Sequence, residues 1–271
     1  MDTTRMSKRI IIFTFICFAL PVLVLLTSMS LGIDGHAVDL DLVLAGSSAE
    51  HLLGCDALGR DVLARLAEGL QLSIFVGVIV VLLGGVLGIT IGVLAGWYGG
   101  WLDVVLMRIA DVVLSFPGIL LAIALAAMLG PGVENLIFAL VMVGWVGFAR
   151  LSRVQVLSLK SAAYIEASLA NGMSFLYISV RHLLPNIAAP LLVEASFGLA
   201  AVMIGEAGLS FLGVGVQAPD ASLGTMIREG TRLMLVEPSL VIWPGLMLFL
   251  IVMVVNVFGD ALRDHLDVKR V

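Results

Sequence analysis

Long apolar runs alternate with short polar segments along almost the whole chain of 271 residues. A helix needs roughly 17–25 mostly apolar residues to cross about 30 Å of hydrocarbon. Six runs reach that length, which predicts an all-α membrane protein with six transmembrane helices. The runs lie near residues 10–30, 72–96, 105–129, 133–149, 188–210 and 240–258.

The positions of Lys and Arg orient these spans, because cytoplasmic loops carry an excess of basic residues. With both termini inside, eleven of the fifteen basic residues fall on the inner side; the outer four are Arg60, Arg65, Arg228 and Arg232. We therefore predict that both termini are cytoplasmic. The basic start followed by an apolar run resembles a signal peptide, but the run exceeds the usual core of about 7–15 residues. We expect it to be retained as the first span.

The polar segments divide the chain into three parts. Residues 1–71 would hold the N-terminal tail, the first span and an acidic outer loop; residues 72–258 form the membrane core; residues 259–271 form a cytoplasmic tail. The core includes a long cytoplasmic loop, 150–187. The outer segment 213–240 contains LGTMIREGTRLMLV, whose amphipathic spacing predicts a helix and favours a folded outer cap or gate over a plain connector.

Composition agrees with a membrane protein, since 61% of the residues are hydrophobic and only 13% are charged. A soluble domain has about 45–50% apolar and about 25% charged residues, so too few charges exist here to cover a soluble surface. No basic patch interleaved with aromatic residues indicates nucleic-acid binding. Cys17 and Cys55 lack a second Cys or a His at ligand spacing, so we predict neither an internal disulfide nor a metal site.

The second span carries a glycine at every fourth position, namely Gly84, Gly88, Gly92, Gly96 and Gly100. Such spacing leaves one ridge of the helix without side chains and lets another backbone approach closely. We predict helix packing along this ridge. The pattern fits static packing and a contact that slides during function equally well.

Acidic residues inside the spans are expensive in lipid and therefore candidates for function. Glu194 and Glu206 lie in the fifth span, about 120° apart around a helix, and either line a transport pathway or bond to neighbouring helices. The structural role is favoured. Arg108 and Asp111, three residues apart, can form a local ion pair on one helix face.

Catalytic sets are missing from the sequence. All four His residues fall outside the predicted spans, and the chain has no H-E-x-x-H, no G-x-S-x-G and no G-x-x-x-x-G-K-[ST] motif. We predict no catalytic residue, no bound cofactor and no phosphate-binding loop. If ATP drives the protein, another polypeptide must bind it.

The cytoplasmic loop contains a semi-polar helix–turn–helix, YIEASLANGMSFLYISVRHLLPN. Residues 161–171 can form a helix that Asn171-Gly172 ends with a left-handed residue, and Ser174 can cap a second helix that Pro185 stops. Exposed apolar side chains around the bend call for a protein partner. From the residues alone, a docking helix and a folded-back loop cap are equally plausible.

The spacing of this loop resembles the "EAA" loop of ABC importer permeases, E-A-A-x3-G-x9-I-x-L-P. Glu166, Ala167, Gly172, Leu184 and Pro185 match it, while His182 takes the Ile position. Further blocks are similar to the dipeptide/oligopeptide/nickel branch, in its "C"-type subunit: HLLGCDALGRDVLARLAEG, RIADVVLSFPGILLAI, AGLSFLGVGVQAPDASLGTMI and NVFGDALRDHLD. Departures are Ser168 for Ala, Leu169 for a frequent Arg, Cys55 for Thr and Val268 for Pro.

The resemblance implies an ABC type I importer permease fold in the bacterial inner membrane. It implies a coupling helix seated in an ATPase, formed by Tyr164, Ile165, Glu166, Ala167, Ser168, Leu169, Gly172, Met173 and Pro185. The expected partners are a second permease, two ATP-binding subunits that carry ATP and Mg, and an extracytoplasmic binding protein. The expected cargo is a di- or oligopeptide, with nickel or a metal chelate as the alternative. A secondary transporter driven by an ion gradient is the alternative from another class, for which inverted repeats and broken helices are typical.

Overall fold

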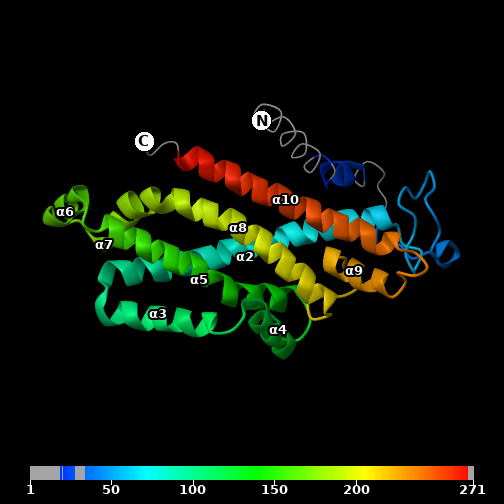
Figure 1. Ribbon diagram of the computed structural model, residues 1–271, viewed down its shortest axis with the longest axis horizontal. Coiled ribbons are helices and arrows are strands. Elements are labelled where there is room, and N and C mark those ends of the chain that lie inside the picture. Colours follow the sequence, from blue (N-terminus) through cyan, green and yellow to red (C-terminus); the bar gives the residue numbers. More distant parts are fainter. Residues whose placement is uncertain (1–18, 20, 28–33, 268–271) are drawn as a thin grey trace, which may run out of the picture. The chain divides into compact units, whose positions relative to one another are not determined.

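The computed structural model describes residues 19, 21–27 and 34–267, and these are almost entirely helical (Figure 1). The elements are η1 (Leu40–Leu42), α2 (Val62–Tyr98), α3 (Gly100–Leu114), α4 (Gly118–Leu129), α5 (Val133–Leu159), α6 (Ala163–Ala170), α7 (Phe175–Ile178), the π-helical turn η2 (Ser179–Leu183), α8 (Leu184–Phe211), α9 (Leu223–Thr231) and α10 (Ser239–Asp267). Two compact units are formed. Unit 1 takes in the chain up to Gly77, Ala126–Leu136 and Met203–Val257; unit 2 takes in Val78–Leu125, Ile137–Val202 and the chain from Phe258.

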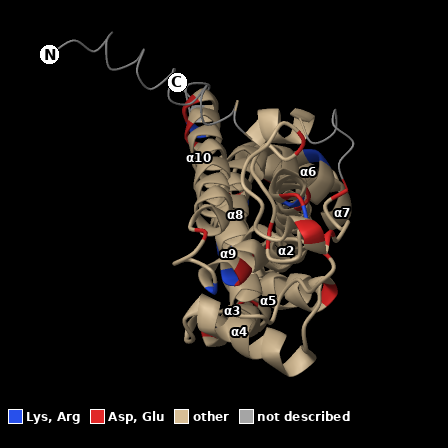
Figure 2. Ribbon diagram, turned by 90° about the vertical axis from the view of Figure 1, so that its right-hand side faces the viewer, with Lys and Arg blue, Asp and Glu red and all other residues tan. Residues whose placement is uncertain are grey.

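Among the residues that the structure describes, four helical segments are long and apolar enough to cross a membrane: Val62–Tyr98, Val133–Leu159, Phe175–Phe211 and Ser239–Leu266. Figure 2 shows long stretches without charge, as on α10 before Asp260. A fifth span exists if α3 and α4 count as one, although they are bent by 86°. The predicted first span near 10–30 lies largely outside the described residues.

The third predicted span, near 105–129, is wrong as a single uninterrupted helix. α3 ends at Leu114 and α4 begins at Gly118. Pro117 lies in the break. It has no N–H to donate and disfavours helical backbone at the residue before it, so an apolar run long enough for one span folds as two helices.

α2 begins at Val62, ten residues before the predicted start of the second span, so the loop before it ends earlier than the predicted residue 71. Asp61 precedes the helix, and its Oδ1 accepts a hydrogen bond from the N–H of Ala64 at 2.8 Å, which satisfies one of the free donors of the first turn. Arg65 and Glu68 make this part of the helix too polar to be recognised by hydropathy.

The core of unit 1 joins the first turns of α2 to α9 and the start of α10. Its buried members include Val62, Leu66, Leu70, Leu223 and Met247. α9 begins with a capping box in which the Ser222 hydroxyl accepts from the N–H of Thr225 and the Thr225 hydroxyl accepts from the N–H of Ser222. The helix predicted in the outer segment is thus present, but it ends at Thr231 rather than continuing to Val236.

A separate apolar core in unit 2 connects α2, α5, α6 and α8. Val93, Val156, Ile165, Ile178 and Leu183 are among its buried members. α6 is only eight residues long, and isolated helices of that length are marginal in water. Its stability therefore comes from packing through Ile165.

Pro185 does not stop the second loop helix, contrary to the expectation from sequence. The chain stays helical from Phe175 to Phe211, with η2 directly before α8. The N–H of Leu184 donates to the carbonyl of Ser179, five residues back, so this turn is wider than an α-helical turn. The proline then stands in the first turn of α8, where a missing N–H is tolerated.

Candidate functional site

The bend in the loop 150–187 is formed at Gly172, as predicted. Gly172 has φ +74°, a backbone conformation that costs L-residues about 1–2 kcal/mol. Its N–H donates to Leu169 O at 2.9 Å, and the N–H of Met173 donates to Ser168 O at 3.1 Å, so the last carbonyls of α6 are satisfied. Ser174 caps α7 by accepting from the N–H of Tyr177 at 3.3 Å. The chain therefore reverses direction sharply between two helices.

The predicted coupling residues divide into an exposed and a buried set. Tyr164, Leu169 and Met173 are 42%, 45% and 37% exposed. Glu166, Ala167, Gly172 and Pro185 are exposed as well. Ile165 is fully buried and Ser168 is 7% exposed, so Ile165 is not one of the exposed apolar side chains that were expected around the bend. One face of α6 faces away from the core of unit 2, and the other is anchored in it.

His182, which replaces Ile in the family pattern, helps to hold α6 against η2. Ser168 Oγ donates to Tyr164 O at 2.8 Å and lies 3.5 Å from His182 Nε2. The imidazole also packs beside the rings of Tyr164 and Tyr177, each with centroids 6.0 Å apart. Polar and aromatic contacts therefore supplement the apolar anchor.

The end of α2 contributes a second anchor that the sequence analysis missed. Phe175 packs against the rings of Trp97 and Tyr98, at centroid distances of 5.4 and 5.2 Å. Lys160 Nζ donates to Trp97 O at 2.5 Å, which places a positive charge at the negative end of the α2 dipole. The loop is thereby connected to α2 as well as to its own flanking helices.

The glycine ridge of α2 lies against α5. A Cβ at Gly84 would lie 3.6 Å from Gly144 C, whereas one at Gly88 or Gly92 would come far too close to the carbonyl oxygens of Trp145 and Ala149. At Gly96 the nearest atom, Arg153 O, would be 2.9 Å away. Gly100 is different: it begins α3, has φ +57° and has nothing within 4 Å of a built Cβ. Four of the five glycines thus meet α5, and Gly100 does not.

Two ion pairs connect α3 to α5. Arg153 donates to Asp103 through Nε at 2.5 Å and Nη2 at 2.6 Å, and Arg150 Nη2 donates to Asp111 Oδ1 at 2.6 Å. The expected local pair of Arg108 with Asp111 is therefore wrong, because Asp111 bonds to a residue of the next long helix. Bidentate geometry makes the Arg153–Asp103 pair the more specific of the two.

Glu194 and Glu206 occur in different units. In unit 2, Glu194 lies beside Gly147 and lines a cavity of about 300 Å³ with Pro190, Arg263 and other residues of α5, α8 and α10. In unit 1, Glu206 is fully buried and accepts hydrogen bonds from Ser73 Oγ at 2.7 Å and Ser210 Oγ at 2.8 Å.

An ionic network that the sequence analysis missed joins the outer loop to α9. Asp56 Oδ2 accepts from Arg60 Nε at 2.7 Å and from Arg65 Nη1 at 2.6 Å, and both arginines reach Glu229 Oε2, at 3.2 and 2.9 Å. Burial acts to raise the pKa of Asp56, but the N–H groups of Leu58 and Arg60 and the two guanidinium charges lower it below its ordinary value. The network spans 164 residues of sequence between Arg65 and Glu229, which no local pattern reveals.

Cys55 stands beside this network and is 2% exposed. Burial, followed by the charges of Asp61, Asp56 and Asp39, raises the pKa of its thiol. A raised pKa keeps the sulfur in the unreactive thiol form. The Cys55 thiol is therefore free, shielded from solvent and favoured in its protonated form.

Helices long and apolar enough to cross a membrane, an anchored and partly exposed EAA-type loop and the capped helix α9 define a class of protein. The chain belongs to the family described as binding-protein-dependent transport system inner membrane components, whose sequence pattern matches residues 88–270. Among its relatives are the glutathione transport system permease protein GsiD of Escherichia coli, 42% identical over 231 residues that cover 85% of this chain and 76% of that protein, and its counterpart in Shigella flexneri, 43% identical over the same length.

Solved structures agree on the fold. The inward-facing MetNI methionine ABC transporter matches with a TM-score of 0.61 at 20% identity, covering 74% of this chain and 95% of that one; a second crystal form gives 0.60. The protein is therefore a permease subunit of an ABC importer in the inner membrane, where ATPase and substrate-binding subunits are its partners. The break between α3 and α4 shows that a broken helix does not by itself indicate a secondary transporter.

Proposed function

We propose that this permease forms half of the translocation pathway for di- or oligopeptides, beside a second, homologous permease. The relatives that transport glutathione support this cargo class, because glutathione is a small peptide. A nickel or metal-chelate cargo is the alternative, since the resemblance in sequence extends to that branch.

The observation that carries the coupling role is the two-sided construction of α6. Its inner side is fixed by Ile165 in the core of unit 2, and its outer side exposes Tyr164, Leu169 and Met173. An exposed apolar patch next to a rigid anchor is typical of a protein-binding surface. Leu176 and Tyr177, 70% and 48% exposed, extend that surface onto α7.

We further propose that α6 inserts into the partner ATPase and transmits its closure into unit 2. ATP and Mg would be bound by the two ATPase subunits alone. Movement of α6 must reach α5 and α8, because Ile165 packs with Val156 and Ile187 in one cluster. Coupling of this kind requires two discrete arrangements of packed helices rather than continuous bending.

The proposed topology has six transmembrane helices and both termini in the cytoplasm. The excess of Lys and Arg in the inner flanks supports it. In this topology the loop 150–187 faces the ATPases, and α9 with the network of Asp56 and Glu229 faces the binding protein. Attaching a reporter enzyme that is active only in the cytoplasm after Gly172, or before Ser222, tests the orientation of both segments.

The coupling role is tested by reversing the exposed charge of α6. We expect Glu166→Lys to abolish ATP-driven peptide uptake by the reconstituted transporter while membrane levels stay normal. Ser161→Lys adds a positive charge to an exposed position just before α6, and it serves as the matched control that should retain uptake. Normal uptake by Glu166→Lys would remove the coupling role from α6.

Cross-linking provides an independent test of contact. Leu169→Cys should capture an ATPase subunit in intact membranes, whereas Ile165→Cys, at a fully buried position, should not. Equal capture by both variants, or by neither, would contradict the proposed orientation of α6. Competition of uptake by dipeptides, glutathione and Ni²⁺ then separates the peptide cargo from the metal alternative.

A further inference from the structure

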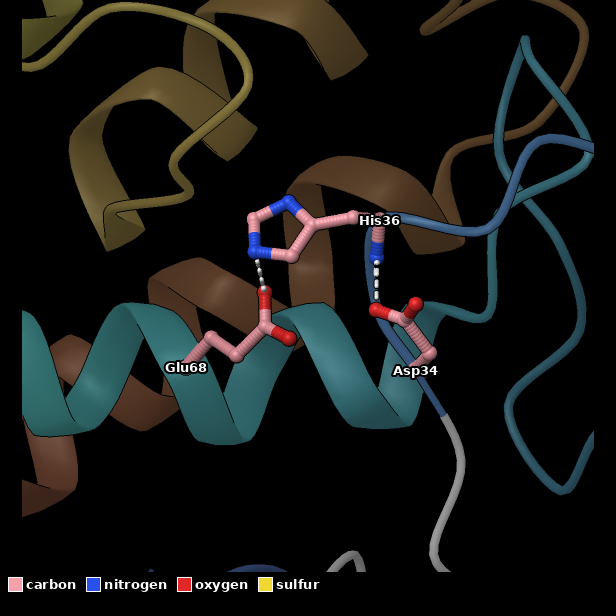
Figure 3. A group of neighbouring side chains, drawn as sticks. All are labelled: Asp34, His36 and Glu68. Atoms are coloured by element: carbon pink, nitrogen blue, oxygen red, sulfur yellow. Dashed lines mark hydrogen bonds and ion pairs between the residues drawn. The ribbon is translucent and has the colours of Figure 1, made fainter.

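Three metal-ligating side chains meet in unit 1 at the start of the described outer loop. Asp34, His36 and Glu68 each offer one possible ligand atom, and these atoms lie within 4.8 Å of one another (Figure 3). Asp34 and His36 stand two residues apart in the chain before η1, and Glu68 projects from α2. None of the contacts assigned to transport above involves these residues.

The distance between His36 and Glu68 suits a bridging ion better than a direct bond. His36 Nε2 lies 3.7 Å from Glu68 Oε2, longer than the roughly 2.7–3.2 Å of an N–H···O hydrogen bond. Two ligands of a tetrahedral Zn²⁺, each about 2.0–2.2 Å from the metal, stand about 3.4 Å apart. By contrast, His51 Nδ1 lies 2.9 Å from Asp61 Oδ2, which is the distance of a direct hydrogen bond.

One oxygen of the Glu68 carboxylate is shielded and makes no hydrogen bond to a described residue, although the side chain as a whole is 33% exposed and forms the ion pair with His36. This oxygen, Oε2, is almost inaccessible to solvent. A buried carboxylate oxygen without a donor is costly, and a cation would satisfy it. Asp34 is already fixed in position, because its Oδ1 accepts from the N–H of His36 at 2.8 Å.

Gly35 brings the loop onto this carboxylate. A Cβ at that position would lie 2.6 Å from Glu68 Oε1 and 2.7 Å from Oε2, so any larger residue would displace the Glu68 side chain. The Asp34-Gly35-His36 turn therefore sits directly on α2. A cavity of about 340 Å³ adjoins it, lined by His36, Glu68, Asp220 and neighbouring side chains, and gives an ion and its water ligands access.

We propose that Asp34, His36 and Glu68 bind one divalent transition-metal ion of the zinc class. An imidazole nitrogen beside two carboxylates selects such an ion over Mg²⁺ and Ca²⁺, which prefer all-oxygen sites. Three protein ligands leave a coordination position for water or for a group that enters the cavity. The ion connects residues 34–36 to α2. No local spacing predicts this site, because Glu68 is 32 residues beyond His36.

Metal titration of the purified, chelator-treated transporter tests the proposal. With Zn²⁺ added against a competing chelating dye, we expect one site per chain. His36→Gln and Glu68→Gln should each weaken binding by about ten-fold or more, while His265→Gln, at an exposed histidine outside the cluster, should bind as the unmodified protein does. Equal binding by His36→Gln and His265→Gln would overturn the proposal.

Gly35→Ala separates site geometry from ligand identity. This variant retains all three ligands but places a methyl group against Glu68, so it too should bind Zn²⁺ at least about ten-fold more weakly. Zn²⁺ should raise the melting temperature of the unmodified transporter, since a ligand of the folded state stabilises it. The same Zn²⁺ should leave the melting temperature of the ligand variants unchanged, and their own cooperative melting without metal shows that they are folded. Equal affinity for Mg²⁺ and Zn²⁺ would reduce the cluster to a non-selective acidic surface and refute the assignment.

Discussion

A single methyl group added at Gly88 tests how closely α2 and α5 must pack. In Gly88→Ala the new Cβ would lie 2.7 Å from Phe148 Cβ and 3.0 Å from Ala149 N, and closer still to the carbonyl oxygen of Trp145. Carbon atoms prefer separations of about 3.5–4.0 Å. Because two of the three neighbours are backbone atoms, no change of rotamer relieves the contact, and α5 must retreat locally by about 1 Å.

Overpacking of this kind costs about 1–3 kcal/mol. For chains of this size about 1 kcal/mol corresponds to roughly 2–4 °C in melting temperature. We therefore expect the purified Gly88→Ala transporter to melt several degrees lower in a thermal-shift assay. Gly84→Ala is the matched control, since its Cβ would meet Gly144 at 3.6 Å, an ordinary contact, and its melting should barely change.

The outcome also distinguishes static packing from a sliding contact. If uptake falls only in proportion to folded protein, the ridge packs statically; if uptake per folded transporter falls further, the contact moves during transport. Identical melting of Gly88→Ala and Gly84→Ala would refute the close approach of α2 and α5.

Three further predictions concern other contacts. Because the pKa of Asp56 is lowered in the folded state, its ionised form stabilises the fold above the ordinary Asp pKa of about 3.9, and this stability is lost as the pH falls through the lowered value. Asp56→Asn should therefore destabilise the fold by about 3–5 kcal/mol at neutral pH. It should also make the melting temperature depend less on acid pH. Glu206→Leu removes the acceptor for the hydroxyl protons of Ser73 and Ser210, while Ser210 Oγ still accepts from the N–H of Val216. A buried donor left unsatisfied costs about 1–3 kcal/mol, so this variant should melt below Glu206→Gln, which can still bond to both hydroxyls. Equal melting of the two variants would contradict the hydrogen bonds. Proline cannot adopt the φ of +74° found at Gly172, so Gly172→Pro should uncouple ATP hydrolysis from uptake. Asparagine tolerates left-handed backbone, so Gly172→Asn should retain coupling. Uncoupled hydrolysis in both variants would show that the backbone conformation at Gly172 is not what coupling requires.

The sequence predicts well those features that depend on neighbours along the chain. Apolar length locates the starts of α5, α8 and α10 to within about four residues, but α5 and α10 continue to Leu159 and Asp267, nine or ten residues beyond the predicted ends, because their last turns are polar. Gly172 and Ser174 are recognisable because a left-handed residue and an N-cap have strong local signatures. Hydropathy also identifies the run around Pro117, but length alone cannot show that a proline splits an apolar run into two helices bent by 86°.

Contacts between distant segments could not be predicted in this way. Asp111 has a basic residue three positions away in Arg108, yet bonds to Arg150, 39 residues later. Ile165 looks like an exposed residue of a short loop helix because only the fold of unit 2 places Val156 and Ile187 around it. Pro185 was wrongly predicted to end the second loop helix for a related reason. The π-helical turn that accommodates this proline has no sequence signature of its own.

The wide turn of η2 also determines the direction in which α6 faces. A turn closed over five residues contains one residue more than an α-helical turn, and each residue of an α-helix advances about 100° around the axis. Deleting one residue between Ser179 and Leu183 would restore a regular helix. It would also rotate α6 by about 100° around the axis of α8, so that Leu169 would face a different direction. A change in the length of η2 would therefore reorient the exposed surface of α6.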